Sequence, residues 1–487
     1  MRNRPNILLI MTDEQRFDAV GYKNPEVVTP NLDRLKRDSI DFTAAYTANP
    51  SCIPARAAIF TGRYPSQCGV PGYMSCLPKR ETTFMKLLRD SGYHTAVVGK
   101  QHFWKSEIER GYDYEDIVDE HEPPENISLE LYEDYFGLPA NRTVSDSVSS
   151  YVKYLYDHGF RRGSELYRQL SPKGIYEFFG EERFYVDSYV GMRGLEWLDE
   201  KRPEDRPWFL TLSFPGPHMP FDGIGLPDAS LYDEDSLSVP ETTVEDLFNK
   251  PPHYLDIVKK YGSVDLERHT SPDGFSPEEI RLMKKAYFAN MTLIDRKIGD
   301  VISRLKELGL YEDTLIIFTS DHGEYMGDFG VASKAQYLSE SLMRIPLLVK
   351  PPVAGFSGYE ERSFASSVEI AATCLTAAGA PVPSNIEQRS LTQFYDGDRE
   401  PKRHSEMYME ARDIRAIRDE RYKLIYYAER PYGEFYDLMA DPVEKYNLWD
   451  DPRVGREKER LLRRLLDRMV RLGENEAQEW HPTAPPI

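Results

Sequence analysis

Short runs of apolar residues, rich in β-branched side chains, constrain the fold of this chain more than any other feature. Five of them are evident, at residues 7–11, 95–98, 209–214, 315–319 and 345–349. The runs are continuous rather than alternating, which is typical of strands that are covered on both faces of a sheet. We therefore expect a large, mostly parallel or mixed sheet sandwiched between helices.

Segments with helical signals lie between these runs. Thr29, a capping residue, precedes Pro30 at the start of one helix, and a second helix begins in the sequence TTFMKLLRDSG and ends at Gly92. Residues 291–308 carry apolar side chains at helical spacing. Because strands alternate with helices along the chain, the sequence predicts an α/β fold.

The pattern of apolar and charged residues changes after residue 381. The segments RAIRDERYKLIYY and EFYDLM read as antiparallel strands, and a charged amphipathic helix is expected at residues 456–472. We therefore predict a catalytic domain over residues 1–381 and a smaller α+β subdomain over residues 382–487. Residues 105–190 are tyrosine-rich and poorly periodic, and we interpret them as an insertion over one end of the sheet.

Charge and cysteine content exclude several classes of protein. A formal net charge of −20 argues against nucleic-acid and anionic-membrane partners, because either would need a basic face. Four cysteines are too few for a disulfide scaffold, and no apolar run approaches the roughly 20 residues of a membrane span. The first apolar run is too short for a signal peptide, so we expect a cytoplasmic protein, or a periplasmic one if a leader precedes this sequence. The oligomeric state stays open.

Polar residues follow four of the apolar runs directly. They are Asp13 and Glu14, Lys100 and His102, His218, and Asp321 and His322. Ligands of open α/β sheets bind beyond the carboxyl ends of the strands, so these residues should meet at one edge. Each of them alone has an ordinary structural explanation, such as a helix cap or a turn, but together they predict a functional site.

The candidate residues divide by chemistry. Donors suited to one divalent cation, most simply Ca²⁺ with Mn²⁺ or Mg²⁺ as alternatives, are Asp13, Glu14, Asp321 and His322. Cations suited to a tetrahedral oxyanion are Arg56, Lys100 and Lys334. Side chains that can transfer protons near neutral pH are His102 and His218.

Cys52 lies in the stretch NPSCIPARAAIFTGRYP, which reads as a helix with Pro54 near its start and Gly62 at its end. The ordinary explanation is a buried thiol, since free cysteine is among the most buried residue types. At a helix N-terminus, however, residue 52 meets unpaired amides and a dipole that favour negative charge. Arg56 follows one turn later and should project toward the same locality.

The sequence Cys52-Ile-Pro-Ala-Arg56, followed by Thr-Gly-Arg63, resembles the signature of the type I, formylglycine-dependent sulfatases of the alkaline-phosphatase superfamily. The resemblance extends to NILLIMTDEQR, TPNLDRL, GYHTAVVGKQH, PHMPF, FTSDHGEYMGD and the C-terminal RYKLIYY and EFYDL. It spans nearly the whole chain, less clearly residues 105–190, and implies an alkaline-phosphatase-like fold.

The resemblance also implies a mechanism. A formylglycine-generating enzyme would oxidise Cys52, and the hydrated aldehyde, placed near the metal, would attack the sulfur of a small-molecule or sugar sulfate ester. The implied ligand residues are Asp13, Glu14, Cys52, Asp321 and His322. The implied catalytic residues are Arg56 and Lys100 at the formylglycine oxygens, His102 as base, and His218 and Lys334 at the sulfate and leaving group.

Two positions depart from the common pattern of that family. Glu14 is longer than the usual aspartate, and His322 replaces a frequent asparagine. Because phosphonate monoester hydrolases share the histidine and the formylglycine motif, phosphonate monoester or phosphodiester hydrolysis is the alternative to sulfate ester hydrolysis. A catalytically inactive, anion-binding relative is a hypothesis from another class, against which the complete residue set argues. A two-metal phosphatase would carry Ser or Thr in place of Cys52.

Overall fold

A computed structural model of the chain describes residues 4–73, 75–103, 108–118, 149–161, 163–171, 173–255, 274–334, 336–397 and 400–474. A mixed sheet of eight strands forms its centre. In spatial order the strands are β11 (Tyr359–Ser366), β2 (Ile40–Tyr46), β10 (Leu347–Lys350), β9 (Thr314–Ser320), β1 (Asn6–Thr12), β7 (Trp208–Ser213), β3 (His94–Gly99) and β4 (Tyr114–Ile117). Only β10 among these runs antiparallel to its neighbours. The predicted mostly parallel or mixed sheet is confirmed.

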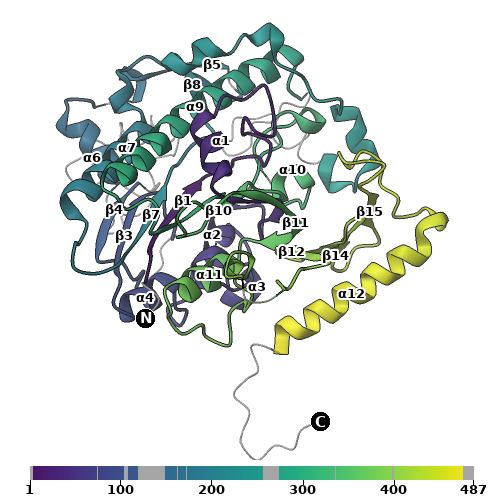
Figure 1. Cartoon of the computed structure of the whole chain (residues 1–487). Coiled ribbons are helices and arrows are strands. Elements are labelled where there is room, and N and C mark those ends of the chain that lie inside the picture. The colour runs from purple at the N-terminus through teal and green to yellow at the C-terminus, as the bar shows by residue number, and fades with distance from the viewer. Residues whose placement is uncertain are drawn as a thin grey trace, which may run out of the picture.

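Two hydrophobic cores cover the two faces of this sheet, which explains why its strands are continuously apolar. Along β1, Leu8 and Ile10 face one core, whereas Ile7 and Leu9 face the other. The first core is closed by α1 (Pro30–Arg37), α7 (Val186–Glu196) and α9 (Pro277–Glu307). The second core is closed by α2 (Cys52–Thr61), α4 (Phe84–Asp90) and α11 (Glu369–Ala377), and Figure 1 shows these helices on opposite sides of the sheet.

Helix α9 starts well before the predicted residue 291. Ser276 caps it by accepting a hydrogen bond from the backbone N–H of Glu279, and Pro277 occupies the first turn. The Glu279 side chain in turn accepts from the backbone N–H of Ser276 at 2.9 Å. The backbone N–H groups of both residues, which have no partner within the helix, therefore find acceptors. The extension matters for function because it carries Asn290 toward the loop after β7.

The C-terminal segment forms an antiparallel sheet, as predicted, and the sheet has four strands, of which the first was not expected. They are β12 (Met407–Ala411), β13 (Ile414–Arg418), β14 (Tyr422–Tyr427) and β15 (Gly433–Asp437). The amphipathic α12 (Gly455–Glu474), drawn in yellow in Figure 1, packs Leu461 and Leu465 against Leu424 and Phe435 of that sheet. The division of the chain at residue 381 stays a prediction.

Residues 105–107, 119–148, 162 and 172 of the predicted insertion lie outside the described residues. The described part contributes β4 of the central sheet, α6 (Ser150–Asp157), the start of α7, and two strands of a small sheet, β5 (Tyr167–Ser171) and β6 (Ile175–Phe178), which β8 (Phe221–Ile224) completes. Since α7 packs into the first core, this segment does more than cover the sheet. The short helices α3 (Pro65–Cys68) and α10 (Glu340–Met343) are the remaining α-helices of the described residues.

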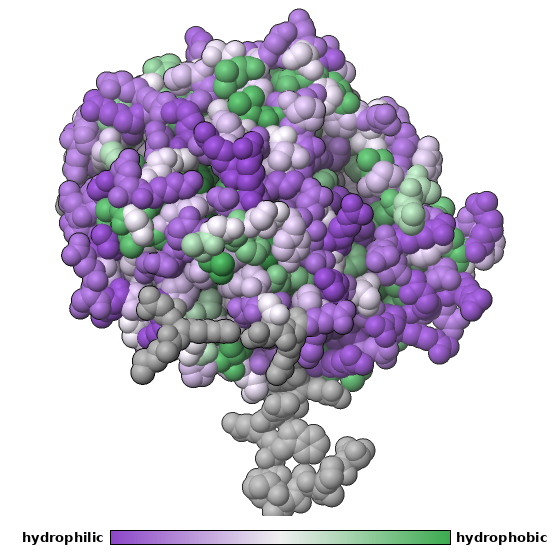
Figure 2. Space-filling view, in the orientation of Figure 1, coloured by the Kyte–Doolittle hydropathy of each residue, from purple (hydrophilic) through white to green (hydrophobic). Residues whose placement is uncertain are grey.

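The visible surface is mostly hydrophilic, with apolar residues in small patches (Figure 2). None of the described helices has the length and apolarity needed to cross a bilayer.

The register of the central strands determines where the polar residues meet. Thr12 at the end of β1 pairs with Ser320 at the end of β9, and the Asp321 N–H donates to the Thr12 carbonyl at 3.2 Å. On the other side, Gly99 at the end of β3 pairs with Ser213 of β7. Gly99 has a φ of 104°, and a Cβ there would lie 1.9 Å from the Ser213 carbonyl oxygen, so only glycine fits.

Candidate active site

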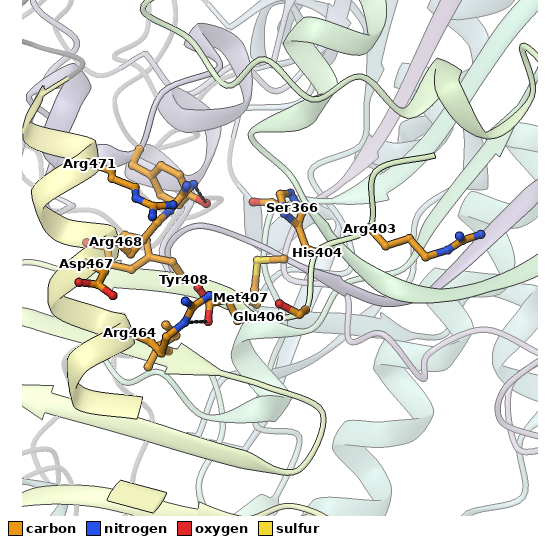
Figure 3. Close-up of a pocket in the computed structure, with 13 residues that line it drawn as sticks. Ser366, Arg403, His404, Glu406, Met407, Tyr408, Arg464, Asp467, Arg468 and Arg471 are labelled. Carbon is orange, nitrogen blue, oxygen red and sulfur yellow. Dashed lines mark hydrogen bonds and ion pairs between the residues drawn. The ribbon is translucent and has the colours of Figure 1, made fainter. Parts of the chain in front are cut away.

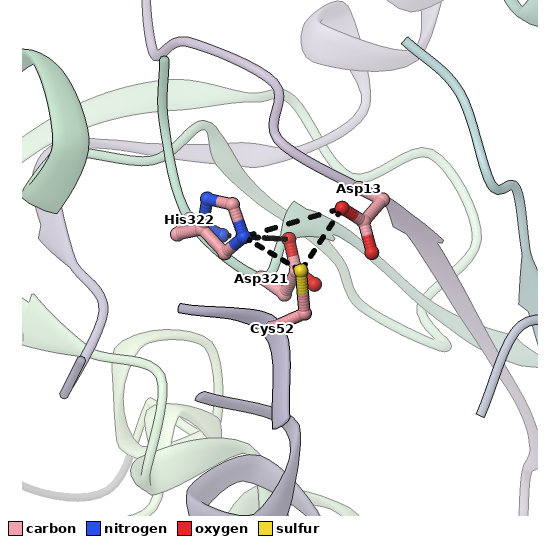
Figure 4. A group of neighbouring side chains, drawn as sticks. All are labelled: Asp13, Cys52, Asp321 and His322. Atoms are coloured by element: carbon pink, nitrogen blue, oxygen red, sulfur yellow. Dashed lines mark hydrogen bonds and ion pairs between the residues drawn. The ribbon is translucent and has the colours of Figure 1, made fainter. Parts of the chain in front are cut away.

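Four ligand-type side chains meet beyond the carboxyl ends of β1 and β9. Asp13, Cys52, Asp321 and His322 are fully buried, and their donor atoms lie within 4.8 Å of one another (Figure 4). The Cys52 Sγ is 3.2 Å from the His322 Nε2 and 3.5 Å from the Asp13 Oδ1. Cys52 arrives on the first turn of α2, so a helix N-terminus faces the two strand ends. The convergence expected for these four residues is what the structure shows.

Neighbouring backbone groups hold these side chains in orientation. The His322 Nδ1 is 2.9 Å from the Gly323 carbonyl oxygen, which can only accept, so Nδ1 carries the proton and Nε2 presents its lone pair to the group. The Asp321 Oδ1 accepts from the backbone N–H groups of Glu14 at 3.1 Å and of His322 at 2.8 Å. Two carboxylates and one oriented imidazole are a donor set that fits a single divalent cation.

Arg56 is locked onto the carboxylates of this group. Its Nε donates to the Asp321 Oδ2 at 2.8 Å, and its Nη2 donates to the Asp13 Oδ2 at 2.9 Å. The Nη1 donates to the Lys100 carbonyl at 2.8 Å and to the Ser213 hydroxyl at 3.0 Å. Burial opposes the charge, but Asp321 and Asp13 outweigh it and raise the pKa of Arg56. This guanidinium therefore joins the ends of β1, β9, β3 and β7, a positioning task that its residue type alone did not indicate.

The site favours an ionised Asp13 and a neutral Cys52. Burial raises the pKa of Asp13, yet Lys100, His218, Arg56 and Lys334 together hold it well below its ordinary value. The Lys100 Nζ is 3.2 Å from the Asp13 Oδ2. Burial, reinforced by Asp13, raises the pKa of the Cys52 thiol well above its ordinary value. An unmodified Cys52 is thus a protonated thiol, which is neither a good metal ligand nor a good nucleophile.

Glu14 lies beside the four-residue group rather than within it. Its backbone has a φ of 61°, and its Oε2 is 3.1 Å from the Lys334 Nζ and 3.2 Å from the His218 Nε2. Lys334 and His218 also contact each other. Together with Asp13 and His218, Glu14 forms a second set of possible metal donors. Burial raises the pKa of Glu14 well above its ordinary value against the pull of Lys334. A role for Glu14 as metal ligand stays a prediction.

His102 lies on the loop that follows β3. It is 2% exposed and has a φ of 60°. Its ring packs edge-on against Tyr73 at a centroid distance of 5.7 Å. It follows Lys100 by two residues, and Lys100 reaches Asp13, so the loop after β3 borders the site. Its role as a base stays a prediction.

Three residues around the site were not identified from the sequence. Ser213 ends β7 and accepts from Arg56. Glu324 is a buried carboxyl that interacts with Glu14, and the acidic segment after β9 contained a signal for it. Asp187 of α7 accepts from the backbone N–H of Gly216 at 3.0 Å, and the Gly216 carbonyl accepts from the Asp13 N–H at 3.1 Å. No local pattern marks Asp187, because its contact with this loop is purely tertiary.

Comparison with known proteins was consistent with this geometry. The model of the sulfatase family matches residues 5–380, and a model described as N-sulphoglucosamine sulphohydrolase, C-terminal, matches residues 327–471. A choline-sulfatase of Rhizobium meliloti (strain 1021) is 29% identical and aligns over 92% of this chain and 83% of its own length. The multifunctional alkaline phosphatase superfamily protein PehA of Trinickia caryophylli is 28% identical over 92% of both chains.

A solved structure supports the fold independently. The phosphonate monoester hydrolase SpPMH from Silicibacter pomeroyi superposes with a TM-score of 0.79, covering 96% of this chain and 95% of that one. The two sequences are 21% identical, so this likeness speaks to the architecture alone.

Proposed function

This chain belongs to the sulfatase family of the alkaline phosphatase superfamily and is a sulfuric ester hydrolase, and we propose that it acts through a formylglycine at residue 52 and one divalent cation. One observation carries the proposal. Cys52 sits buried against Asp13 and His322, while Arg56 from the same helix binds Asp13 and Asp321. Helix α2 therefore places the proposed nucleophile and fixes the two carboxylates that would hold the cation.

The cation would be held by Asp13, Asp321, His322 and an oxygen of the modified residue 52. Oxygen donors predominate in this set, so Ca²⁺ is the ion that we propose, with Mn²⁺ or Mg²⁺ as alternatives. When bound, the ion supplies Lewis-acid stabilisation of charge on oxygen. Arg56 and Lys100 neutralise Asp13 and Asp321 from the opposite side, so that the two carboxylates tolerate full burial.

The first chemical step uses residue 52 as the nucleophile. After oxidation of the thiol and hydration of the aldehyde, one hydroxyl oxygen of the diol would attack the ester sulfur, and the bond from sulfur to the leaving oxygen would break. His218 and Lys334 lie together at 20% and 11% side-chain exposure, where they can reach a substrate. We assign them to binding a sulfate oxygen and to protonating the leaving oxygen.

The second step restores the aldehyde. A base would remove the proton from the remaining hydroxyl of the sulfated residue 52, the carbonyl would re-form, and sulfate would leave with the electrons of the C–O bond. We assign this base to His102, because it is buried on the same loop as Lys100, whose Nζ reaches Asp13. A small-molecule or sugar sulfate is the proposed substrate, and a formylglycine-generating enzyme is the proposed maturation partner.

Hydrolysis of phosphonate monoesters or phosphodiesters is the alternative activity, and His322 is the residue that favours it. Sulfate monoesters, phosphonate monoesters and phosphodiesters each carry one negative charge, so the cations attract all three. A sulfate ester presents three bare oxygens to His218 and Lys334. A second organic substituent at that position would leave buried donors unpaired, which is costly.

Two measurements test this proposal. Peptide mass spectrometry of the active fraction should show residue 52 as an aldehyde with the thiol lost, and full activity from wholly unmodified Cys52 would refute the nucleophile. A matched set of nitrophenyl esters should give a higher kcat/KM for the sulfate than for the phenylphosphonate or the phosphodiester. Faster phosphonate or diester hydrolysis would make the alternative the main activity.

A further inference from the structure

A cavity of about 210 Å³ lies between α12 and the segment that leads into β12 (Figure 3). One wall is the face of α12 that carries Arg464, Arg468 and Arg471, whose spacing places them on one side of a helix. The opposite wall includes Ser366 at the end of β11 and the ring of His404. We call this space, defined by these residues, the α12 cavity.

The arginine wall offers more hydrogen-bond donors than its neighbours use. Arg464 donates through Nε to Glu406 at 2.8 Å, and Arg468 donates through Nη2 to Glu387 at 3.2 Å and to the Tyr64 hydroxyl at 3.5 Å. Arg471 is exposed at the rim of the cavity and makes no ion pair or hydrogen bond with any residue in the described part of the chain. Since each guanidinium has five N–H donors, several of them remain for a ligand.

The opposite wall contains a buried hydroxyl whose hydrogen-bonding capacity is not used. Ser366 is 2% exposed, and its Oγ has no hydrogen-bond partner among the residues that the structure describes. A buried hydroxyl without a partner costs free energy, and an acceptor placed in the cavity would remove that cost. Met407 and Ile417 add apolar lining, which strengthens polar contacts by limiting access of water.

The α12 cavity is separate from the candidate active site. None of its lining residues belongs to the ligand group of Asp13 or to the loops after β3 and β7. Its lining includes Tyr64, just beyond Gly62, which caps the end of α2 opposite to Cys52. A helix of that length spans about 15 Å, so a ligand in the cavity cannot contact residue 52.

We propose that the α12 cavity binds a tetrahedral oxyanion of the sulfate class, either free sulfate or the sulfate group of an ester. Donors approach from both walls, and among the residues that the structure describes only Glu406 and Asp467 bring side-chain carboxylates to the lining. Guanidinium and hydroxyl donors on opposite sides match an anion that accepts in several directions better than they match a planar carboxylate. A molecule that hydrolyses sulfate esters would thus hold its product anion, or a second sulfate of its substrate, at a site apart from catalysis.

Sulfate binding to variants of the two walls tests this proposal. Isothermal titration with sodium sulfate, at ionic strength matched with sodium chloride, is carried out in a Lys334→Ala background that weakens the active site. Arg471→Gln and Ser366→Ala should each weaken the remaining binding about tenfold or more, as expected for the loss of a hydrogen bond to a charged group. Arg463→Gln is the matched control, because Arg463 lies on α12, has 75% side-chain exposure, pairs with Glu459 and does not line the cavity.

Two results would overturn the proposal. One is sulfate binding that Arg471→Gln and Ser366→Ala leave unchanged, and the other is binding that Arg463→Gln weakens as much as they do. If the Lys334→Ala protein does not fold, the same wall substitutions are made in the wild-type enzyme. There, Arg471→Gln and Ser366→Ala should remove one of two sulfate-binding sites, whereas Arg463→Gln should remove neither. If the wild-type enzyme binds sulfate in the α12 cavity but does not hydrolyse sulfate esters, that result counts against the proposed function and not against the cavity site.

Kinetics distinguish the two sources of the anion. If the cavity takes an ester sulfate of the substrate, Arg471→Gln should raise KM for a multiply sulfated oligosaccharide and leave KM for nitrophenyl sulfate unchanged. If it takes free sulfate, KM should stay constant for both substrates while direct sulfate binding is lost. Either result upholds the site and identifies its ligand.

Discussion

Asp187→Asn should reduce the loss of stability that the protein suffers as the pH rises from about 4 to about 7, without displacing the loop that carries His218. Asp187 is fully buried, and its Oδ1 accepts from the Gly216 N–H at 3.0 Å. Burial raises the pKa of Asp187 from 3.8 to about 7, against the hydrogen bond from Gly216 and the influence of the nearby Asn290 amide. The folded state therefore binds a proton between these two pH values that the unfolded state has released.

The sign and size of the effect follow from linkage. Stability falls as pH rises wherever the folded state binds more protons than the unfolded state, so wild type loses stability from about pH 4 to about pH 7. The difference between 3.8 and about 7 corresponds to at most about 4 kcal/mol. Between about pH 5 and about pH 8 the loss attributable to Asp187 is about 3 kcal/mol. An asparagine has no charge to bury and removes that loss.

The side chain of asparagine can also replace the contacts. Its oxygen can accept from Gly216, and its amide can donate to the Asn290 Oδ1, which has no hydrogen-bond partner among the described residues, once the Asn290 amide rotates to present that oxygen. Asp187→Ala, in contrast, leaves the buried Gly216 N–H without an acceptor. Because the Gly216 carbonyl holds the Asp13 N–H, we expect Asp187→Ala to lower kcat by about tenfold or more, whereas Asp187→Asn keeps it near wild type.

Urea unfolding at several pH values, together with steady-state kinetics, checks this prediction. Asp222 is a useful comparison, because burial also raises its pKa to about 7 while its partner is the Tyr185 hydroxyl rather than Gly216. Asp222→Asn should flatten the pH dependence of stability as Asp187→Asn does. A wild-type pH dependence in the Asp187→Asn protein, or equal kcat in the Asn and Ala variants, would refute the reasoning.

Other predictions concern the site itself. Asp321→Ala should abolish binding of the divalent cation and lower turnover by several orders of magnitude, and metal content unchanged by this variant would exclude the ligand set. His102→Ala should accumulate a sulfated enzyme that intact-protein mass spectrometry detects. His218→Ala should lose most activity with poor leaving groups, so identical leaving-group dependence in the two histidine variants would contradict their assigned roles. Gly99→Ala should destabilise the fold by more than about 3 kcal/mol in urea unfolding, because its Cβ would meet the Ser213 carbonyl at 1.9 Å.

The sequence by itself determined the architecture and the place of the site. Continuous apolar runs require cover on both faces, and the residue that follows a parallel strand must lie at the carboxyl edge of the sheet. Asp13, Asp321 and His322 could therefore be brought together from spacing alone, and the helix start at Cys52 placed the thiol beside them. These inferences rest on local periodicity, which one sequence displays directly.

Tertiary structure alone decided which partners the side chains of the site contact. Glu14 adopts a φ of 61°, which a non-glycine residue rarely takes and which no local pattern reveals, and its carboxylate turns toward Lys334 rather than into the group of four. Arg56 joins four strand ends because each of them supplies an acceptor to a guanidinium that has lost its water. Asp187 reaches the site through the Gly216 peptide from a distant helix. Such contacts depend on which acceptors remain unpaired once the chain has folded, and that is a property of the packed molecule rather than of any segment.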